Sequence, residues 1–250
     1  KPQSKQFATV SKRVYTVDDN YFENIDTQKK AYFLGWLLTD GNIKGYINSL
    51  RGKESSNQIE LSLVYYDVDV LEEFKDELKS DAPITYRKAR TTIYKGKEIK
   101  SKPRCCFRFS SYKMVSDLKK YGVYKAKTYN VRYPDLLEER FAPGFIAGVI
   151  SGDWSVSIKN NHNKAELLRC NIAGNLDLLK PIKEILVKTI DYNSDKKIYK
   201  YRSTKNLYNL ELNQTETIAL YYWLKDNGVS LMKRKDEIIK NYIEKEKESL

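Results

Sequence analysis

The fold is decided by two related stretches of the chain, FLGWLLTDG at residues 33–41 and IAGVISGDW at residues 146–154. Each stretch is an apolar run of helical character with a glycine inside it and an aspartate five residues after that glycine. A single run of this kind is common where a buried helix enters a turn. Because the run occurs twice, it predicts two similar halves that each deliver one carboxylate to a shared place.

The two glycines predict a helix pair in close contact. Glycine inside a helix costs about 0.5–1 kcal/mol relative to alanine, so its presence on an apolar face indicates that another backbone passes nearby. We therefore expect two helices to touch at Gly35 and Gly148. Asp40 and Asp153 then fall at the C-terminal ends of these helices, where the helix dipole is negative and a lone carboxylate is disfavoured. A divalent cation would remove that penalty.

The residues around the two aspartates predict a magnesium site. Two carboxylates, together with the main-chain carbonyls of Thr39 and Gly152, form a hard, all-oxygen ligand set that suits Mg²⁺. His162 is the only histidine in the chain, which argues against mechanisms that need a histidine base or histidine metal ligands. The predicted metal ligands are therefore Asp40, Asp153, Thr39 and Gly152.

The composition favours an anionic polymer as partner. The 250 residues include 45 Lys or Arg against 33 Asp or Glu, which gives a formal net charge of +12. Such a charge favours nucleic acid, because neutralised phosphates release condensed counterions. The 20 tyrosines are interleaved with Lys and Arg at residues 86–88, 94–95 and 198–202. These tyrosines fit either the β propensity of strands or a DNA-facing role.

The cysteines and the apolar runs indicate the cellular environment. Cys105, Cys106 and Cys170 form neither a disulfide framework nor a zinc pattern, and the adjacent pair would point to opposite faces of a strand. We expect an intracellular, reducing compartment such as cytoplasm, nucleoid or organelle matrix. No apolar run reaches the roughly 20 residues of a membrane span, so no membrane partner is expected.

The order of predicted elements repeats and gives an α+β fold class. The predicted parts are an N-terminal arm at residues 1–25, a first half at 26–127, a linker at 128–142 and a second half at 143–250. The first half is predicted as helix 27–39, strands 42–49 and 58–66, helix 68–79, strands 84–94 and 105–110 around a basic loop at 95–104, and helix 114–121. The second half is predicted as helix 144–152, strands 155–159 and 167–173, helix 176–189, strands 197–202 and 207–213, and helices 216–226 and 234–246.

A second matched feature supports the duplication. In each half a Gly-Val pair follows a helix, and a lysine stands four residues after the valine. Gly122 and Gly228 are natural residues for a helix C-terminus. Lys127 and Lys233 are the matched lysines, and their equivalent places favour a functional role. The neighbouring basic residues are interpreted as solvated charge: Lys125, Arg234 and Lys235.

Together these features resemble the LAGLIDADG homing endonucleases in their single-chain form with two motifs. The resemblance covers roughly residues 20–245. It implies two pseudo-symmetric αββαββα halves, with the motif helices packed at a pseudo-twofold axis. It further implies saddle-shaped antiparallel sheets that read the major groove of double-stranded DNA, where each base pair shows a distinct pattern. A monomer with internal symmetry is expected, acting on a long asymmetric site.

The resemblance also implies a reaction, the hydrolysis of phosphodiester bonds in DNA. The metal-binding acidic residues of the family match Asp40 and Asp153, and the basic residues near the scissile phosphates match Lys127 and Lys233. Mg²⁺ or Mn²⁺ would support cleavage, whereas Ca²⁺ would bind without supporting it. Each half would cut one strand without a covalent enzyme intermediate.

Two further positions and two departures complete the site. A polar residue where the second strand meets the next helix often orients hydrolytic water in this family, and Asp67 and Asn175 stand at that place. Both also fit a helix N-cap. Trp154 replaces the usual glycine after the second aspartate. Leu38 and Ser151 occupy a motif position that is frequently acidic, which leaves one carboxylate per motif.

Other functions remain open on the sequence alone. The alternative is that this chain keeps the fold without cleavage, and acts as a DNA-binding regulator or as an intron RNA maturase. A purely structural or protein-interaction role fits the charge of +12 least well.

Overall fold

The computed structural model describes residues 14–48, 53–94, 96–125, 131–153, 155–160, 166–201 and 206–248. The first half contains the elements α1 (Gln28–Thr39), β1 (Gly41–Asn48), β2 (Lys53–Val64), the short 3₁₀ helix η1 (Tyr65–Asp67), α2 (Val68–Glu77), β3 (Ile84–Arg87), β4 (Thr91–Tyr94), β5 (Lys97–Lys100), β6 (Arg104–Ser110) and α3 (Tyr112–Lys120). Thr27 caps α1, since its hydroxyl accepts a hydrogen bond from the Lys30 backbone at 3.1 Å.

The second half repeats the order helix, two strands, helix, two strands, helix, and adds one helix; among the described residues it has no counterpart of β4 and β5. Its elements are η3 (Glu139–Phe141), α4 (Ala142–Asp153), β7 (Ser155–Asn160), β8 (Glu166–Gly174), α5 (Leu176–Ile190), β9 (Tyr199–Lys200), β10 (Tyr208–Leu212), α6 (Gln214–Asp226) and α7 (Lys233–Glu248). Pro143 lies in the first turn of α4, where proline is tolerated. Gly122 and Gly228 follow α3 and α6 with φ of +84° and +69°, as expected for glycines that end helices.

The strands form two antiparallel sheets with matching order. The first sheet has the order β1-β2-β6-β3 and the second has the order β7-β8-β10-β9. Alternate residues of the central strands are buried against the helices, among them Ile59 and Leu61 of β2 and Leu168 and Cys170 of β8. The predicted α+β fold class with two pseudo-symmetric halves is therefore confirmed.

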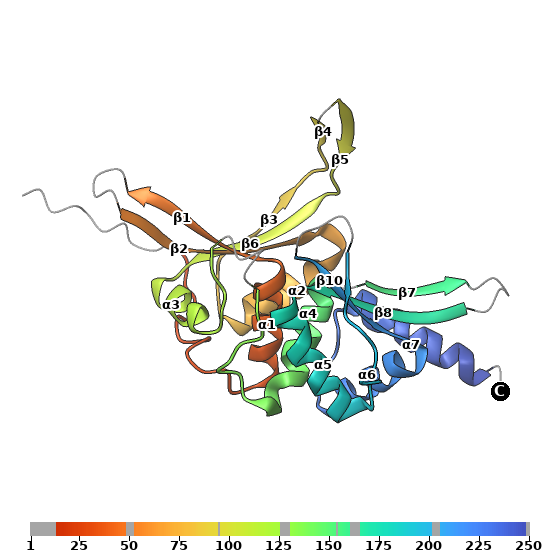
Figure 1. Cartoon of the computed structure of the whole chain (residues 1–250). Helices are drawn as coiled ribbons and strands as arrows, with labels where there is room; N and C mark the ends of the chain where they lie inside the picture. Colours follow the sequence, from red (N-terminus) through yellow and green to blue (C-terminus); the bar gives the residue numbers. More distant parts are fainter. Residues whose placement is uncertain are drawn as a thin grey trace, which may run out of the picture.

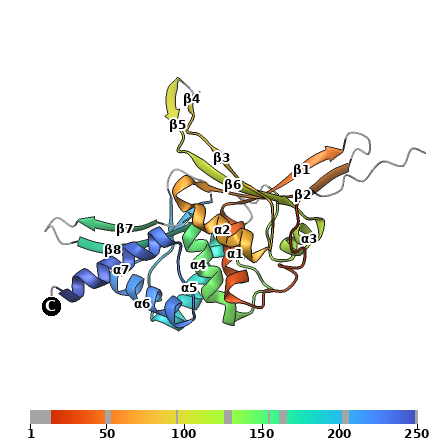
Figure 2. The ribbon, with the colours of Figure 1, turned by 180° about the vertical axis from the view of Figure 1, so that it is seen from behind.

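The sheets and the helices occupy different sides of the molecule. In Figure 1 the strands run along the upper side and the helices lie below them, with α1 and α4 at the centre between the two sheets. The reverse view in Figure 2 gives the same arrangement. One face of each sheet is thus left uncovered by helices.

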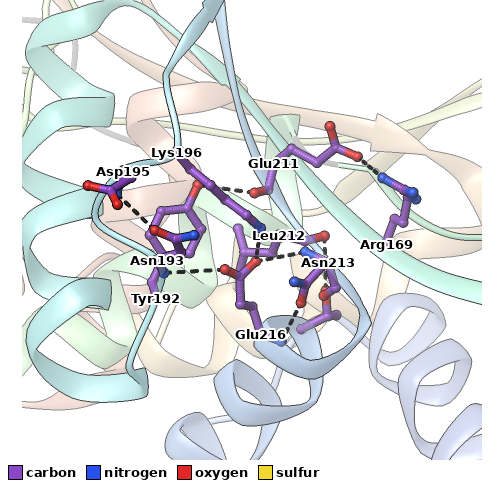
Figure 3. Close-up of polar contacts among 10 residues, drawn as sticks. Arg169, Tyr192, Asn193, Asp195, Lys196, Glu211, Leu212, Asn213 and Glu216 are labelled. Atoms are coloured by element: carbon purple, nitrogen blue, oxygen red, sulfur yellow. Dashed lines mark hydrogen bonds and ion pairs between the residues drawn. The ribbon is translucent and has the colours of Figure 1, made fainter.

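A polar network around the buried Glu216 connects the second sheet to α6 (Figure 3). Asn213 caps α6 and exchanges hydrogen bonds with Glu216, whose carboxylate accepts from the Asn213 backbone at 2.8 Å. The same carboxylate pairs with Lys196 and accepts a hydrogen bond from the Asn193 backbone. Tyr192 donates its hydroxyl to the Glu211 carbonyl at 3.1 Å. The loop after α5 is therefore tied to β10 and α6.

The predicted strand at 84–94 and the basic loop at 95–104 are wrong in detail. The chain leaves the first sheet after Arg87, and β4 pairs with β5 as a separate two-stranded ribbon. The sequence signal for β5 was hidden because Lys97, Glu98 and Lys100 are exposed charged residues with no apolar alternation. The strand predicted at 197–202 is also shorter, since β9 contains only Tyr199 and Lys200.

The segment before α1 packs against the first half over part of its length. Tyr21 and Phe22 are buried, whereas Val14 and Tyr15 are exposed. Phe7, a further apolar residue of this segment, lies outside the described residues. The boundaries assigned to arm, halves and linker stay predictions.

Candidate functional site

The two halves meet where the backbones of α1 and α4 touch. A Cβ atom placed on Gly148 would lie 2.0 Å from the Tyr32 carbonyl oxygen, and one placed on Gly35 would lie 2.5 Å from the Phe145 carbonyl oxygen. No real side chain fits at such distances, so only glycine permits this approach. The predicted contact at Gly35 and Gly148 is confirmed.

Two further glycines lie in the seam between α1 and α4. Gly144 and Gly152 of α4 also face α1, since a Cβ on Gly144 would meet the Gln28 carbonyl oxygen at 2.2 Å. The three glycines of α4 are spaced four residues apart, which places them on one helix face. The side chain of Gln28 closes the seam by accepting a hydrogen bond from the Gly144 backbone at 2.9 Å.

The seam brings the ends of α1 and α4 together. A Cβ on Gly152 would lie 2.1 Å from the Thr39 hydroxyl oxygen and 2.8 Å from a carboxylate oxygen of Asp40. The Asp40 carboxylate therefore rests against the residue that precedes Asp153. Asp153 is the last residue of α4 and is exposed, whereas Asp40 is half-buried just after α1. The two acidic helix ends thus lie at one place on the molecule.

This donor set fits a hard divalent cation. The oxygen donors at the two helix ends are the carboxylates of Asp40 and Asp153 and nearby main-chain carbonyls, including those of Thr39 and Gly152. Across the described residues, no three His, Cys, Asp or Glu side chains form a metal-binding group. Mg²⁺ commonly retains waters and takes only one or two carboxylates, so a two-carboxylate set matches its chemistry.

A buried lysine supports the second helix end, and the prediction that Lys235 is solvated is wrong. Lys235 is only 4% exposed, and its Nζ donates hydrogen bonds to the carbonyls of Ile150 and Ser151, both at 2.8 Å. These carbonyls belong to the last turn of α4, where the helix leaves acceptors without intrahelical partners. Burial lowers the pKa of Lys235 to about 8. The lysine places a donor and positive charge at the last turn of α4, which ends at Asp153, and it interacts electrostatically with Asp40.

Helical spacing is the signal that would have identified Lys235. The buried face of α7 consists of residues at positions that recur with helical period: Lys235, Ile239, Tyr242 and Ile243. A lysine on that apolar face is a candidate for a buried, hydrogen-bonded role. Ser151 adds to the same contact, since its hydroxyl oxygen accepts from the Met232 backbone at 2.9 Å.

Arg234 links the halves: its side chain is 56% exposed, as predicted for a solvated charge, but it also forms an ion pair that was not predicted. Its Nη2 lies 3.1 Å from a carboxylate oxygen of Asp67, and its Nε lies 3.3 Å from the other oxygen. The Asp67 side chain is only 8% exposed. Asp67 precedes α2 but makes no side-chain hydrogen bond that caps it. Its described partner is an arginine that follows it by 167 positions in the chain.

The other predicted site residues have different settings. Asn175 caps α5, with its side-chain oxygen accepting from the Leu178 backbone at 3.1 Å. Lys233 is the first residue of α7 and is exposed. Lys127 and Trp154 lie outside the described residues. The catalytic roles assigned to these positions stay predictions.

The uncovered face of the first sheet carries a charged cluster. Glu60 of β2 lies between Lys44 of β1 and Arg108 of β6, with distances of 2.7 Å from Lys44 Nζ and 2.6 Å from Arg108 Nε to the same carboxylate oxygen. Burial alone would raise the pKa of Glu60, but the hydrogen bonds and charges of Lys44 and Arg108 outweigh it, and the pKa is lowered. Glu60 therefore holds both cations in fixed positions.

The second sheet has a more exposed counterpart. Arg169 of β8 pairs with Glu211 of β10, and their side chains are 37% and 34% exposed. Figure 3 shows this pair beside the Glu216 network. Asn209 donates its side-chain amide to the Asn171 oxygen at 3.1 Å. Both sheets thus present arginine and carboxylate groups on the face that the helices leave open, and the second sheet adds side-chain amides; these are groups of the kinds that recognise base edges.

Comparison with solved structures agrees with this architecture. The LAGLIDADG meganuclease I-CpaMI bound to uncleaved DNA matches with a TM-score of 0.52 and 17% identity, covering 83% of this chain and 87% of that chain. The I-LtrWI LAGLIDADG homing endonuclease bound to target DNA matches with a TM-score of 0.54 and 13% identity, covering 90% and 88%. The LAGLIDADG homing endonuclease I-GzeII in complex with its DNA target matches with a TM-score of 0.52 and 13% identity, covering 82% and 86%.

These matches define the fold. The chain has the fold of the single-chain LAGLIDADG homing endonucleases, and the resemblance inferred from the paired motifs is confirmed at that level. No family model and no curated protein matches the sequence. Among the described residues, every helix is too short or too polar to cross a membrane.

Proposed function

We propose that this chain is a metal-dependent, sequence-specific endonuclease that hydrolyses phosphodiester bonds of double-stranded DNA. The observation that carries the proposal is the contact of the Asp40 carboxylate with Gly152, which joins the acidic ends of α1 and α4. The fold supports it, because the matched structures are LAGLIDADG enzymes bound to DNA. The net charge of +12 supports a polyanionic partner.

In this proposal Asp40 and Asp153 hold Mg²⁺, or Mn²⁺ in its place, together with the carbonyls of Thr39 and Gly152. The bound cation would activate water and stabilise negative charge on the reacting oxygens. Ca²⁺ would occupy the same ligands without supporting cleavage. Two carboxylates contributed by different halves give each half a share in the chemistry, so each half would cut one strand.

The surrounding residues position these ligands. The Thr39 hydroxyl donates to the carbonyls of Gly35 and Trp36, both at 3.2 Å, which fixes the last turn of α1 before Asp40. Lys235 satisfies the last turn of α4 and reduces the cost of a carboxylate at the negative end of the helix dipole. We assign Lys233 and Lys127 to the approach of the scissile phosphates.

Asp67 and Asn175, at the strand-to-helix junctions, are less suited to orient the hydrolytic water. The side-chain oxygen of Asn175 already accepts the hydrogen bond that caps α5. Both carboxylate oxygens of Asp67 contact Arg234. We assign both to positioning of the backbone beside the site.

The duplicated halves supply the pseudo-twofold symmetry within one chain, so we propose a monomer acting on a long asymmetric target. Three buried cysteines without disulfides support an intracellular, reducing compartment.

The test is cleavage of a randomised duplex library with Mg²⁺, followed by kinetics on the selected target. We expect cutting of both strands that EDTA abolishes, and a loss of at least about 100-fold in Asp40→Asn and in Asp153→Asn. Asp226→Asn is the matched control, because Asp226 also ends a helix but lies at the end of α6. If the unmodified chain bound DNA tightly and specifically but did not cut it with Mg²⁺, the proposed endonuclease activity would be refuted. That result would favour a DNA-binding regulator or an intron RNA maturase.

A further inference from the structure

The connection between β3 and β6 forms a ribbon that belongs to neither sheet. Its two strands pair in register from Thr91 with Lys100 to Tyr94 with Lys97. The base of the ribbon is closed by Ser101, whose backbone and side chain both donate to the Arg90 carbonyl, at 2.8 and 3.0 Å. Figures 1 and 2 show that β4 and β5 project away from all the helices, beyond the uncovered face of the sheets.

The ribbon has no protein partner among the described residues. Its apolar side chains are left in solvent, with Ile93 80% exposed and Ile99 49% exposed. An isolated two-stranded ribbon is marginally stable in water at best. Such an element gains order when a partner covers it.

The charge of this connection identifies the partner. Residues 87–104 contain eight Lys or Arg and a single Glu, a net charge of +7 out of +12 for the whole chain. Within the described residues, no ion pair joins a carboxylate to these exposed cations: Lys88, Arg90, Lys97, Lys100 and Lys102. Like charges at this density repel one another and favour a polyanion.

Among its described residues, the second half has no equivalent ribbon. Residues 88–103 connect β3 to β6, whereas the shorter segment 201–207 connects β9 to β10. The corresponding side of the second sheet is instead tied down by the Lys196 and Glu216 pair. The ribbon is thus an asymmetric addition to an otherwise duplicated molecule.

We propose that the β4–β5 ribbon is a separate DNA-binding arm that grips the phosphate backbone alongside the half-site bound by the first sheet. The proposal rests on the proposed function in one respect, namely that the uncovered sheet faces meet duplex DNA. The ribbon is continuous with β3 and β6 of the first sheet, so a duplex on that sheet passes beside it. The arm contributes affinity through charge and takes no part in the chemistry.

The test removes three charges from the ribbon and three from elsewhere. The ribbon variant combines Arg90→Ala, Lys97→Ala and Lys100→Ala, which are exposed side chains. The control variant combines Lys180→Ala, Lys188→Ala and Lys197→Ala, which are exposed lysines on α5 and in the loop that follows it. Binding to the selected target is measured by fluorescence anisotropy in Ca²⁺ over a range of salt concentrations. Thermal unfolding of each variant confirms that the fold is retained.

We expect the ribbon variant to lower the slope of log Kd against log salt by about 2 to 3, because each phosphate contact contributes about 0.9. The control should change the slope by less than about 1. Hydroxyl-radical footprinting should show lost protection at one end of the site only. An equal slope change in both variants, or lost protection at both ends, would overturn the proposal.

The outcomes separate the two proposals. Cleavage by the unmodified chain with no specific effect of the ribbon variant refutes the arm alone. Binding without cleavage, combined with the expected change in slope, refutes the endonuclease and leaves the arm standing. If the unmodified chain does not bind duplex DNA, both proposals are refuted.

Discussion

The first half places the carboxylate of its ion pair on β2 and the guanidinium on β6, as Glu60 and Arg108. The second half reverses them, with Arg169 on β8 and Glu211 on β10. The pair on the first sheet is buried around Glu60, whereas the pair on the second sheet is about one-third exposed. In contrast, the seam between α1 and α4 uses glycine from both halves.

The difference shows which parts of a duplicated fold are free to diverge. At the seam, backbone meets backbone, so any side chain larger than hydrogen at Gly35 or Gly148 clashes with atoms that cannot move independently. On the uncovered sheet faces, side chains meet solvent or a partner, and the core does not constrain their charge. A target read by two unlike faces is expected to be asymmetric.

The seam should be the most sensitive part of both halves. Gly148→Ala and Gly35→Ala are each expected to destabilise the protein by about 3 kcal/mol or more, because the new methyl group overpacks a helix contact. Gly174→Ala is the control, since its methyl group would meet only leucine side chains at 3.3 to 3.4 Å and should change stability by less than about 1 kcal/mol. Urea unfolding measures all three. If Gly35→Ala left the free energy of unfolding unchanged, the two helices would not contribute equally to the seam, and this prediction would be contradicted.

The ion pair between Arg234 and Asp67, which links the two halves, should show the next largest effect on stability. Arg234→Ala leaves the buried Asp67 carboxylate without its described partner, and we expect a loss of about 2 kcal/mol in the free energy of unfolding. Lys233→Ala, at the adjacent exposed position, should cost less than about 0.5 kcal/mol. Adding Asp67→Asn to Arg234→Ala should recover part of the loss, and an additive double variant would argue against a direct pair.

The charged pairs on the two sheets should differ in strength. Arg108→Ala is expected to cost about 1 kcal/mol, since Glu60 remains buried with Lys44 as its remaining described cationic partner. Arg169→Ala should cost less than about 0.5 kcal/mol, because that pair is screened by solvent. Equal costs in chemical unfolding would show that burial does not distinguish the two faces.

The smallest effect should appear as a pH dependence. The pKa of Glu60 is lowered in the folded protein, so its ionised form stabilises the fold above the unfolded value of 4.5. That stabilisation is lost as the pH falls through the lower, folded pKa. The stability difference between the unmodified chain and Glu60→Gln should be constant near neutral pH and shrink below about pH 4.5. A difference that grows with acid would reverse the assigned sign.

Much of the fold follows from local sequence patterns. The repeated apolar run with its glycine predicts α1 and α4 and their contact, because glycine inside a helix has few other physical reasons. The alternation of Ile59, Leu61 and Leu63 predicts β2, since one face of that strand is buried. Gly122 and Gly228 mark the ends of α3 and α6 through their positive φ.

The remaining features depend on contacts between distant residues. No local pattern predicts that Arg234 reaches Asp67, which lies in the other half. The burial of Lys235 depends on two carbonyls in the last turn of α4, which is far from α7 in the sequence. β5 is exposed along its whole length, so it lacks the apolar alternation by which strands are identified in a sequence. Lys127 is predicted from the duplication and from the family resemblance, and it lies outside the described residues.

The most direct test of the account is Mn²⁺ binding to the complex with target DNA, followed by electron paramagnetic resonance. The central claim is that Asp40 and Asp153, one from each half, hold the same cation site. We predict that Asp40→Asn and Asp153→Asn each weaken Mn²⁺ binding by about tenfold or more, while Asp226→Asn leaves it unchanged. Unchanged Mn²⁺ affinity in either of the first two variants would contradict a site shared by the two halves.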